Sequence, residues 1–197
     1  MKPKTQNEWK VGKTKVIQQI VQVPLDDYLD QKRRSDEKSG LLMPKFDLVV
    51  GIDPGNAKLG LTFLNYHSEE SECYEIKFTS ERLAVQRAAQ IRTTISDTVF
   101  NQTLCNFSGN LLIAVEGSAF SMPYRNTELA EARIVEALWF VDNFHIPPEN
   151  CVFIQPNTMR KQVFGNGKLR AEEQWPELEP DAASSLAVAI AGIKMNT

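Results

Sequence analysis

Three acidic residues stand where the sequence changes from one structural pattern to another. Asp53 and Glu116 each follow a short apolar run of strand type, and Asp181 opens an alanine-rich segment of helix type. Carboxylates that converge on one spot repel one another unless a cation lies between them. Hard carboxylate oxygens that leave room for water and phosphate are the ligands that Mg²⁺ prefers. The three residues therefore predict a divalent-cation site if the fold brings them together.

Each carboxylate also has a purely structural interpretation. Asp53 begins an Asp-Pro-Gly sequence, which is common in turns. Glu116 precedes a glycine and fits a solvated strand end, and Asp181 follows a proline and suits the N-cap of a helix. Only the joint placement of the three favours metal binding.

The elements that must position these residues begin near Phe46. Apolar, β-branched runs predict strands, and apolar residues at three- and four-residue spacing predict helices. The predicted strands are 48–52, 59–64, 73–78, 110–115 and 151–154, and the predicted helices are 80–101, 126–144 and 181–194. Three consecutive strands with short connections indicate an antiparallel meander, and the later strand–helix–strand connections indicate parallel additions. We therefore predict an α/β fold with one mixed sheet flanked by helices.

This topology explains how the three acids are expected to meet. Adjacent strand ends place their side chains at one edge of a sheet, and a helix N-terminus can point at the same place. Asp53 and Glu116 follow two of the predicted strands, and Asp181 lies at the start of the last helix.

The first 45 residues have a different character. Residues 15–23 alternate as a strand would, and residues 26–38 are dense in charge before the Ser39–Gly40 hinge. We predict an N-terminal arm or small extension over 1–45 and a single domain over 46–197. Extension of the sheet, reinforcement of a dimer and docking of a partner all remain open as roles for the arm.

Composition sets further bounds. Hydrophobic residues make up 42% and charged residues 24% of the 197, as in globular proteins. Three dispersed cysteines and two histidines argue against a disulfide framework and a Cys/His zinc site, so we expect a reducing, cytoplasmic compartment. No apolar run approaches the roughly 18–20 residues of a membrane-spanning helix, and the N-terminus lacks the apolar region of a secretory signal. The net charge of −3 excludes a strongly basic, clamp-like surface.

Several segments, in order, resemble the signature segments of RuvC-type Holliday-junction resolvases, within the RNase H-like nuclease superfamily. The matching segments are 50–55, 114–116, 120–126 with 129–133, 155–161 with 165–168, and 181–189. The resemblance covers about residues 46–195. It implies an RNase H-like fold, a homodimer, and an Mg²⁺-dependent endonuclease of DNA recombination and repair that hydrolyses phosphodiesters at four-way or related branched junctions. It implies no organic cofactor and no membrane partner. It also implies a bacterial or phage-like cytoplasmic setting, with an organelle left open.

The resemblance also assigns roles to individual residues. Asp53, Glu116 and Asp181 are expected to be catalytic and to hold two Mg²⁺ ions, which Mn²⁺ is expected to replace. Ser184 occupies the family's fourth metal-ligand position. The residues expected to contact DNA are Phe120, Tyr124, Arg125, Asn126, Arg160, Lys161, Lys168 and Arg170.

Ser184 is the main departure from the family pattern. The last helix usually carries Asp-x-x-Asp, with both acids on one helical face, and a serine leaves the site one charge short. Glu177 or Glu179 is placed to compensate, as is a water held by Ser184. A protein that binds junctions without cutting them therefore stays open as an alternative. A YqgF-like RNA-processing nuclease also stays open, because it shares the Gly-x-Asp-x-Gly type of start found at Gly51–Gly55. An actin-like ATPase is excluded because that fold needs a duplicated domain.

Overall fold

The computed structural model describes residues 4–55, 57–78, 84–97, 107, 109–117, 134 and 137–196. Among these residues, the strands are β1 (Thr5–Val11), β2 (Thr14–Gln22), β3 (Leu48–Pro54), β4 (Lys58–Asn65), β5 (Glu70–Lys77), β6 (Leu111–Glu116) and β7 (Cys151–Ile154). The helices are α1 (Gln31–Lys38), α2 (Ala84–Ile95), α4 (Pro156–Phe164), α5 (Ala171–Gln174) and α6 (Pro180–Asn196), with 3₁₀ turns at Leu25–Asp27 and Pro148–Asn150. Residues 137–144 are also helical. No described helix is long and apolar enough to cross a membrane.

The described strands form one mixed sheet in the order β1-β2-β5-β4-β3-β6-β7. The strand pairs from β1 to β3 are antiparallel, whereas β6 pairs parallel with β3 and β7 pairs parallel with β6. The antiparallel meander β3–β4–β5 and the later parallel additions are those that the sequence predicted. The mixed, RNase H-like sheet is thus confirmed.

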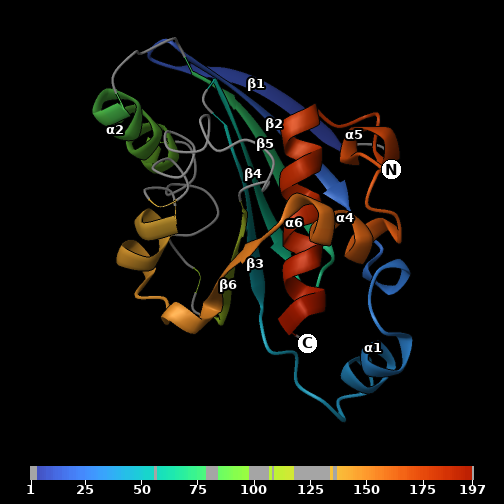
Figure 1. Ribbon diagram of the computed structural model, residues 1–197. Helices are drawn as coiled ribbons and strands as arrows, with labels where there is room; N and C mark the ends of the chain where they lie inside the picture. The colour runs from blue at the N-terminus through green and yellow to red at the C-terminus, as the bar shows by residue number, and fades with distance from the viewer. Residues whose placement is uncertain are drawn as a thin grey trace.

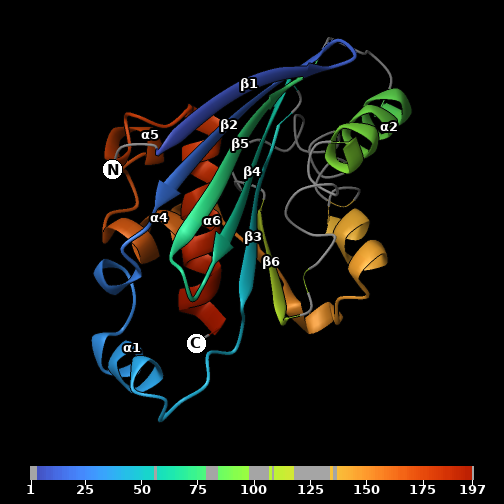
Figure 2. The ribbon, with the colours of Figure 1, turned by 180° about the vertical axis from the view of Figure 1, so that it is seen from behind.

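Helices cover both faces of this sheet (Figures 1 and 2). One face packs against α6, with α4 and α5 beside it, and its core includes Val49, Leu112 and the buried side of α6. The opposite face packs against the helical residues 137–144, and its core includes Val50, Ile113 and Phe140. Neighbouring residues of β3 and β6 therefore enter opposite cores, which explains why both strands are continuously apolar.

The N-terminal strands belong to this sheet. β2 pairs with β5 along its length, from Lys15 opposite Lys77 to Gln22 opposite Glu70. Val16 and Val21 are fully buried, one in each core. Of the roles that the sequence left open for the N-terminal segment, the structure shows extension of the sheet; the boundary at residue 45 stays a prediction.

Three helices were not predicted from the sequence. α1 is almost entirely polar, so it carries no apolar periodicity, and it starts where the Asp30 side chain accepts a hydrogen bond from the Arg33 amide. α4 has the signals of a helix, with Pro156 in its first turn and Gly165 at φ +70° after its end. The resemblance assigns DNA contacts to Arg160 and Lys161 in this segment but predicts no helix there. α5 is a single short turn.

Two glycines let α6 lie directly on the sheet. A Cβ at Gly51 would stand 2.1 Å from the Ser185 carbonyl oxygen, and a Cβ at Gly60 would stand 1.9 Å from the Asp181 carbonyl oxygen. Both distances are far below any real contact, so no other residue fits at either position without movement. The buried side of α6 is correspondingly rich in alanine. This close approach fixes where α6 begins relative to β3 and β4.

Candidate active site

Asp53 and Glu116 lie at adjacent strand ends. The parallel register of β3 and β6 pairs Ile52 with Val115, and the next residues along the two strands are Asp53 and Glu116. Both carboxylates are half-buried. The sheet therefore brings together these two predicted site residues.

Asp181 reaches the same place from α6. It is the second residue of that helix, and its carbonyl oxygen lies over Gly60, the β4 residue that pairs with Asp53. The convergence of the three acids from two strands and one helix, expected from the sequence, is observed.

The electrostatics of Asp53 reflect this crowding. Its pKa lies well above the usual value, first because of burial and then because of the Glu116 and Asp181 carboxylates. The Ser184 hydroxyl works in the opposite direction and lowers the pKa of Asp53. Ser184, which the resemblance places at a fourth ligand position, thus acts on the acidic site but brings no charge to it.

A fourth acid, Glu75 of β5, stands beside Asp181. Its side chain is fully buried, and its Oε2 accepts a hydrogen bond from the Asp181 amide at 3.4 Å. Burial and the Glu75 carboxylate raise the pKa of Asp181, against the effect of Lys58. Burial would raise the pKa of Glu75 too, but hydrogen bonds from Lys77 and Asp181 outweigh it and lower that pKa.

Two lysines balance these carboxylates. Lys58 Nζ lies 3.5 Å from Glu75 Oε1 and 3.5 Å from Asp181 Oδ2. Lys77 Nζ lies 2.7 Å from Glu75 Oε1 and 3.5 Å from Glu179 Oε2. Glu179, one of the two acids considered as a substitute for the missing charge, thus pairs with Lys77, and the acid next to Asp181 is Glu75.

Sequence reasoning missed Glu75, although a signal was present. Alternation along β5 puts Glu75 on the same face as Cys73, which lies in the core beneath α6. An acid at an inward-facing strand position is rarely placed there without a partner. The sequence predicts the strand, but Glu75 was not recognised as a charged residue on its buried face.

The donor set suits a hard divalent cation in its chemistry. Asp181 Oδ2 is buried and makes no hydrogen bond, with Lys58 Nζ at 3.5 Å as its ion-pair partner. The Glu116 and Asp181 carboxylates raise the pKa of Asp53, and a cation would favour its charged form. Within the described residues, however, no group of three or more His, Cys, Asp or Glu is arranged to hold one metal ion. The acids converge, but their side chains are not gathered as a finished coordination sphere.

The predicted DNA-binding residues fall into two sets. Arg160 and Lys161 lie on α4, and Lys168 and Arg170 lie in the turn before α5, all on the α6 side of the sheet. Lys161, Lys168 and Arg170 are exposed, and Arg160 is half-buried. The Lys168 amide donates to Asn166 Oδ1, which tightens the turn. The other predicted contacts, Phe120, Tyr124, Arg125 and Asn126, lie outside the described residues.

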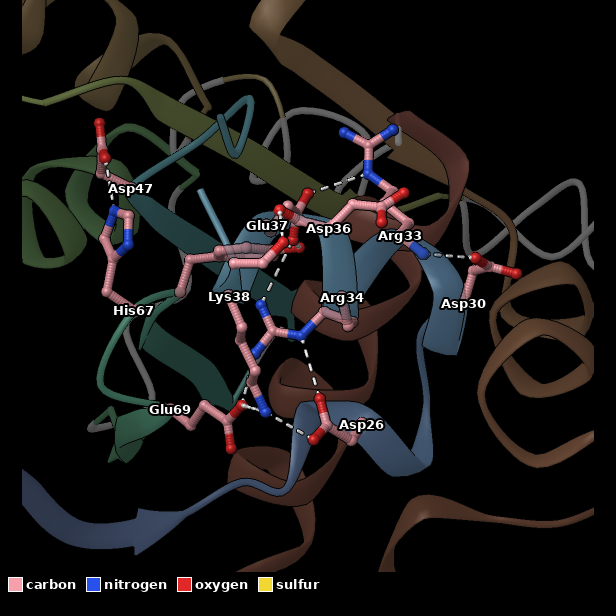
Figure 3. Close-up of polar contacts among 12 residues, drawn as sticks. Asp26, Asp30, Arg33, Arg34, Asp36, Glu37, Lys38, Asp47, His67 and Glu69 are labelled. Atoms are coloured by element: carbon pink, nitrogen blue, oxygen red, sulfur yellow. Dashed lines mark hydrogen bonds and ion pairs between the residues drawn. The ribbon is translucent and has the colours of Figure 1, made fainter. Parts of the chain in front are cut away.

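A separate polar network surrounds Arg34 of α1 (Figure 3). The Arg34 side chain is 6% exposed and pairs with Asp26 at 3.2 Å, with Glu37 at 3.5 Å and with Glu69. Its guanidinium also lies 4.8 Å from the centre of the Tyr66 ring. These partners account for the buried charge, so the network anchors α1 against the β4–β5 turn.

Comparison with solved structures places the fold of this chain in a known class. The chain is similar to a structure of Thermus thermophilus RuvC, with a TM-score of 0.52 and 18% identity over 73% of this chain and 92% of that chain. It is also similar to T. thermophilus RuvC in complex with a Holliday junction substrate, with a TM-score of 0.54 and 18% identity over 76% of this chain and 94% of that chain. No protein-family model and no curated protein sequence matches it. The RuvC-type, RNase H-like fold indicated by the sequence motifs is therefore confirmed.

Proposed function

We propose that this protein is an Mg²⁺-dependent, structure-selective DNA endonuclease that resolves four-way or related branched junctions in recombination and repair. One observation carries the proposal: Asp53, Glu116 and Asp181 converge from β3, β6 and α6 on a fold of RuvC type. A solved neighbour with that fold is bound to a Holliday junction.

The acidic residues would act as ligands. Asp53, Glu116 and Asp181 would hold two Mg²⁺ ions, or Mn²⁺ in their place, and Ser184 would orient Asp53 through its hydroxyl. The bound cations would supply an activated water for in-line attack on a phosphodiester and would stabilise the leaving oxygen. The protein itself contributes carboxylates that the sheet and α6 bring to one edge of the fold.

The exposed cations of α4 and the following turn would contact the phosphate backbone. Lys161, Lys168 and Arg170 are exposed, and Arg170 also lies 3.7 Å from Glu172. Phosphate contacts position a duplex without reading its sequence. We propose recognition of the junction by shape and backbone, and a homodimer whose symmetry matches that of a junction cut on two strands. The free thiols Cys73 and Cys151 fit a reducing, cytoplasmic compartment, which is also part of the proposal.

One observation favours a second function, junction binding without cleavage. Ser184 leaves the fourth-ligand position neutral, and the negative charge of Glu75 is already matched by Lys77 and Lys58. A site that is one charge short binds divalent cations less tightly.

A comparison of substrates tests the proposed function. Full-length protein is incubated with a labelled four-way DNA junction, with the matching linear duplex and with a structured RNA, each with and without Mg²⁺. The proposal expects tight binding of the four-way junction and cleavage of it only with Mg²⁺. Binding without cleavage would support the second function, and cleavage confined to RNA would contradict both.

A further inference from the structure

A buried glutamine of the N-terminal strands holds the segment that leads into α6. Gln19 of β2 is 2% exposed. Its Nε2 donates to the Glu177 carbonyl oxygen at 2.9 Å, and its Oε1 accepts from the Glu179 amide at 2.8 Å. The nitrogen and the oxygen of the Gln19 side-chain amide thus both bind the backbone, four and two residues before Asp181.

Glu75 of β5 holds the next part of the same segment. Its Oε2 accepts from the Asp181 amide, and Lys77 links its Oε1 to Glu179. β2 and β5 are neighbours in the sheet, with Ile17 opposite Glu75 and Gln19 opposite Cys73. Two inward-facing polar side chains from adjacent strands therefore bind three backbone groups in residues 177–181: the Glu177 carbonyl oxygen and the Glu179 and Asp181 amides.

The position of these contacts suits control of Asp181. Backbone groups that are buried must find partners, and here the Glu177 carbonyl oxygen and the Glu179 and Asp181 amides find theirs on side chains of the sheet. The sheet contact of α6 at Gly60 fixes the carbonyl side of Asp181, and Glu75 fixes its amide side. The direction in which the Asp181 carboxylate leaves the backbone is consequently set by β2, β4 and β5 together.

We propose that the N-terminal strand β2 is part of the machinery of the acidic site, with Gln19 and Glu75 as positioning residues that aim Asp181 at the divalent cations. This inference rests on the proposed function, and it gives the N-terminal extension a role beyond widening the sheet. Residues that orient metal ligands typically change metal affinity or activity by roughly 10- to 100-fold when replaced.

The test compares two neighbouring glutamines of β2. Gln19→Met keeps the length and packing of the side chain but removes both hydrogen bonds to residues 177 and 179. Gln18→Met is the matched control, because Gln18 is 6% exposed and bonds to Tyr74 and Glu72 on the other face of the sheet. Full-length proteins are compared by calorimetric titration with Mn²⁺ alone, by amide hydrogen exchange of residues 177–181, and by urea unfolding.

We expect Gln19→Met to weaken Mn²⁺ binding roughly tenfold and to speed exchange of the Glu179 amide. Gln18→Met should lose a comparable free energy of unfolding and change neither quantity. If Gln19→Met does not fold, Gln19→Asn, which withdraws the amide by one methylene group, takes its place with the same expectation.

Other outcomes separate the inference from the proposed function. Equal Mn²⁺ affinity in the wild type and the Gln19 variant, or equal loss in both glutamine variants, would overturn the inference while the proposed function stands. Wild-type protein that binds no Mn²⁺ would contradict the proposed function and, with it, the inference.

Discussion

At the scale of residues, the fold brings carboxylates together although their negative charges repel one another. Asp53 is surrounded by Glu116 and Asp181, and both burial and these carboxylates raise its pKa. A carboxyl whose pKa is higher in the folded than in the unfolded state binds its proton more tightly when folded. Its contribution to stability is therefore full below the unfolded value of about 3.9 and is lost as the pH rises through the raised folded pKa.

This sign gives a prediction for the metal-free protein. Asp53→Asn removes the charge, so at pH 7 the variant should be more stable than the wild type. We expect the Tm to rise by roughly 2–8 °C, because relief of about 1–2 kcal/mol shifts the Tm of a domain of this size by about 2–4 °C per kcal/mol. Calorimetric unfolding in the presence of a chelator measures it.

The pH dependence supplies the control. The advantage of Asp53→Asn should shrink as the pH falls and vanish below about pH 3.9, where the wild-type carboxyl is protonated in both states. Glu75, whose pKa is lowered, contributes with the opposite sign but is unchanged between the two proteins. An advantage that is constant with pH, or a variant less stable at pH 7, would show that Asp53 carries no such repulsion.

The part of the site that was predictable from sequence is the part fixed by element ends. Asp53, Glu116 and Asp181 could be placed together because each follows or begins a strongly patterned element. Glu75 and Gln19 could not be recognised in the same way, because their roles depend on pairings between distant segments. Gln19 acts on residues more than 150 positions away, through a strand order that the sequence left open.

At the scale of elements, α6 is set by its fit on the sheet. Gly60 leaves the space in which the first turn of α6 lies, and Gly51 does the same one turn further along. The fit is close because the inward side of α6 carries small residues. Ser185, within this side, bonds to Thr62 of β4 at 2.7 Å.

Gly60→Ala should therefore displace α6. We expect a loss of about 1–3 kcal/mol in the free energy of unfolding, which is the usual cost of overpacking, measured by urea unfolding. Gly167→Ala is a suitable control, since a Cβ there makes ordinary contacts with the flexible Lys161 side chain at 3.4 Å and the Asn157 carbonyl oxygen at 3.7 Å. A Gly60 variant as stable as the Gly167 variant would contradict the close approach of α6.

Elements were predictable in proportion to their apolar pattern. β3, β4, β6 and α6 are dense in apolar residues, and their positions agree with the expectations to within a few residues. β1 is mostly exposed and α1 is almost wholly polar, so neither has a periodicity to detect. Their structure depends on pairing with β2 and on the Arg34 network, which are tertiary effects.

At the scale of the whole molecule, charge is unevenly distributed along an acidic chain. Residues 1–48 carry ten Lys and Arg against seven Asp and Glu, whereas residues 49–197 carry twelve against eighteen. A DNA-binding surface must therefore be local, and α4 with the following turn supplies exposed cations on the face that carries α6.

Removal of one of these cations tests the surface. Lys168→Ala should weaken binding of a four-way junction and lower the slope of log Kd against log salt concentration by about 0.9, as expected for one lost duplex phosphate contact. Lys10→Ala, which removes an exposed lysine of the edge strand β1, should leave the slope unchanged. Equal effects of the two variants would remove α4 and its turn from the DNA surface.

The most direct test of the central claim is cleavage of a four-way DNA junction with Mg²⁺ by the wild type and by Asp53→Asn, with every nick mapped to its strand and position. Our account predicts paired nicks on opposing strands in the wild type and a loss of at least about a hundredfold in the variant, as when an essential electrostatic group is removed. Unchanged cleavage by Asp53→Asn, or tight junction binding by the wild type with no nick at all, would contradict it.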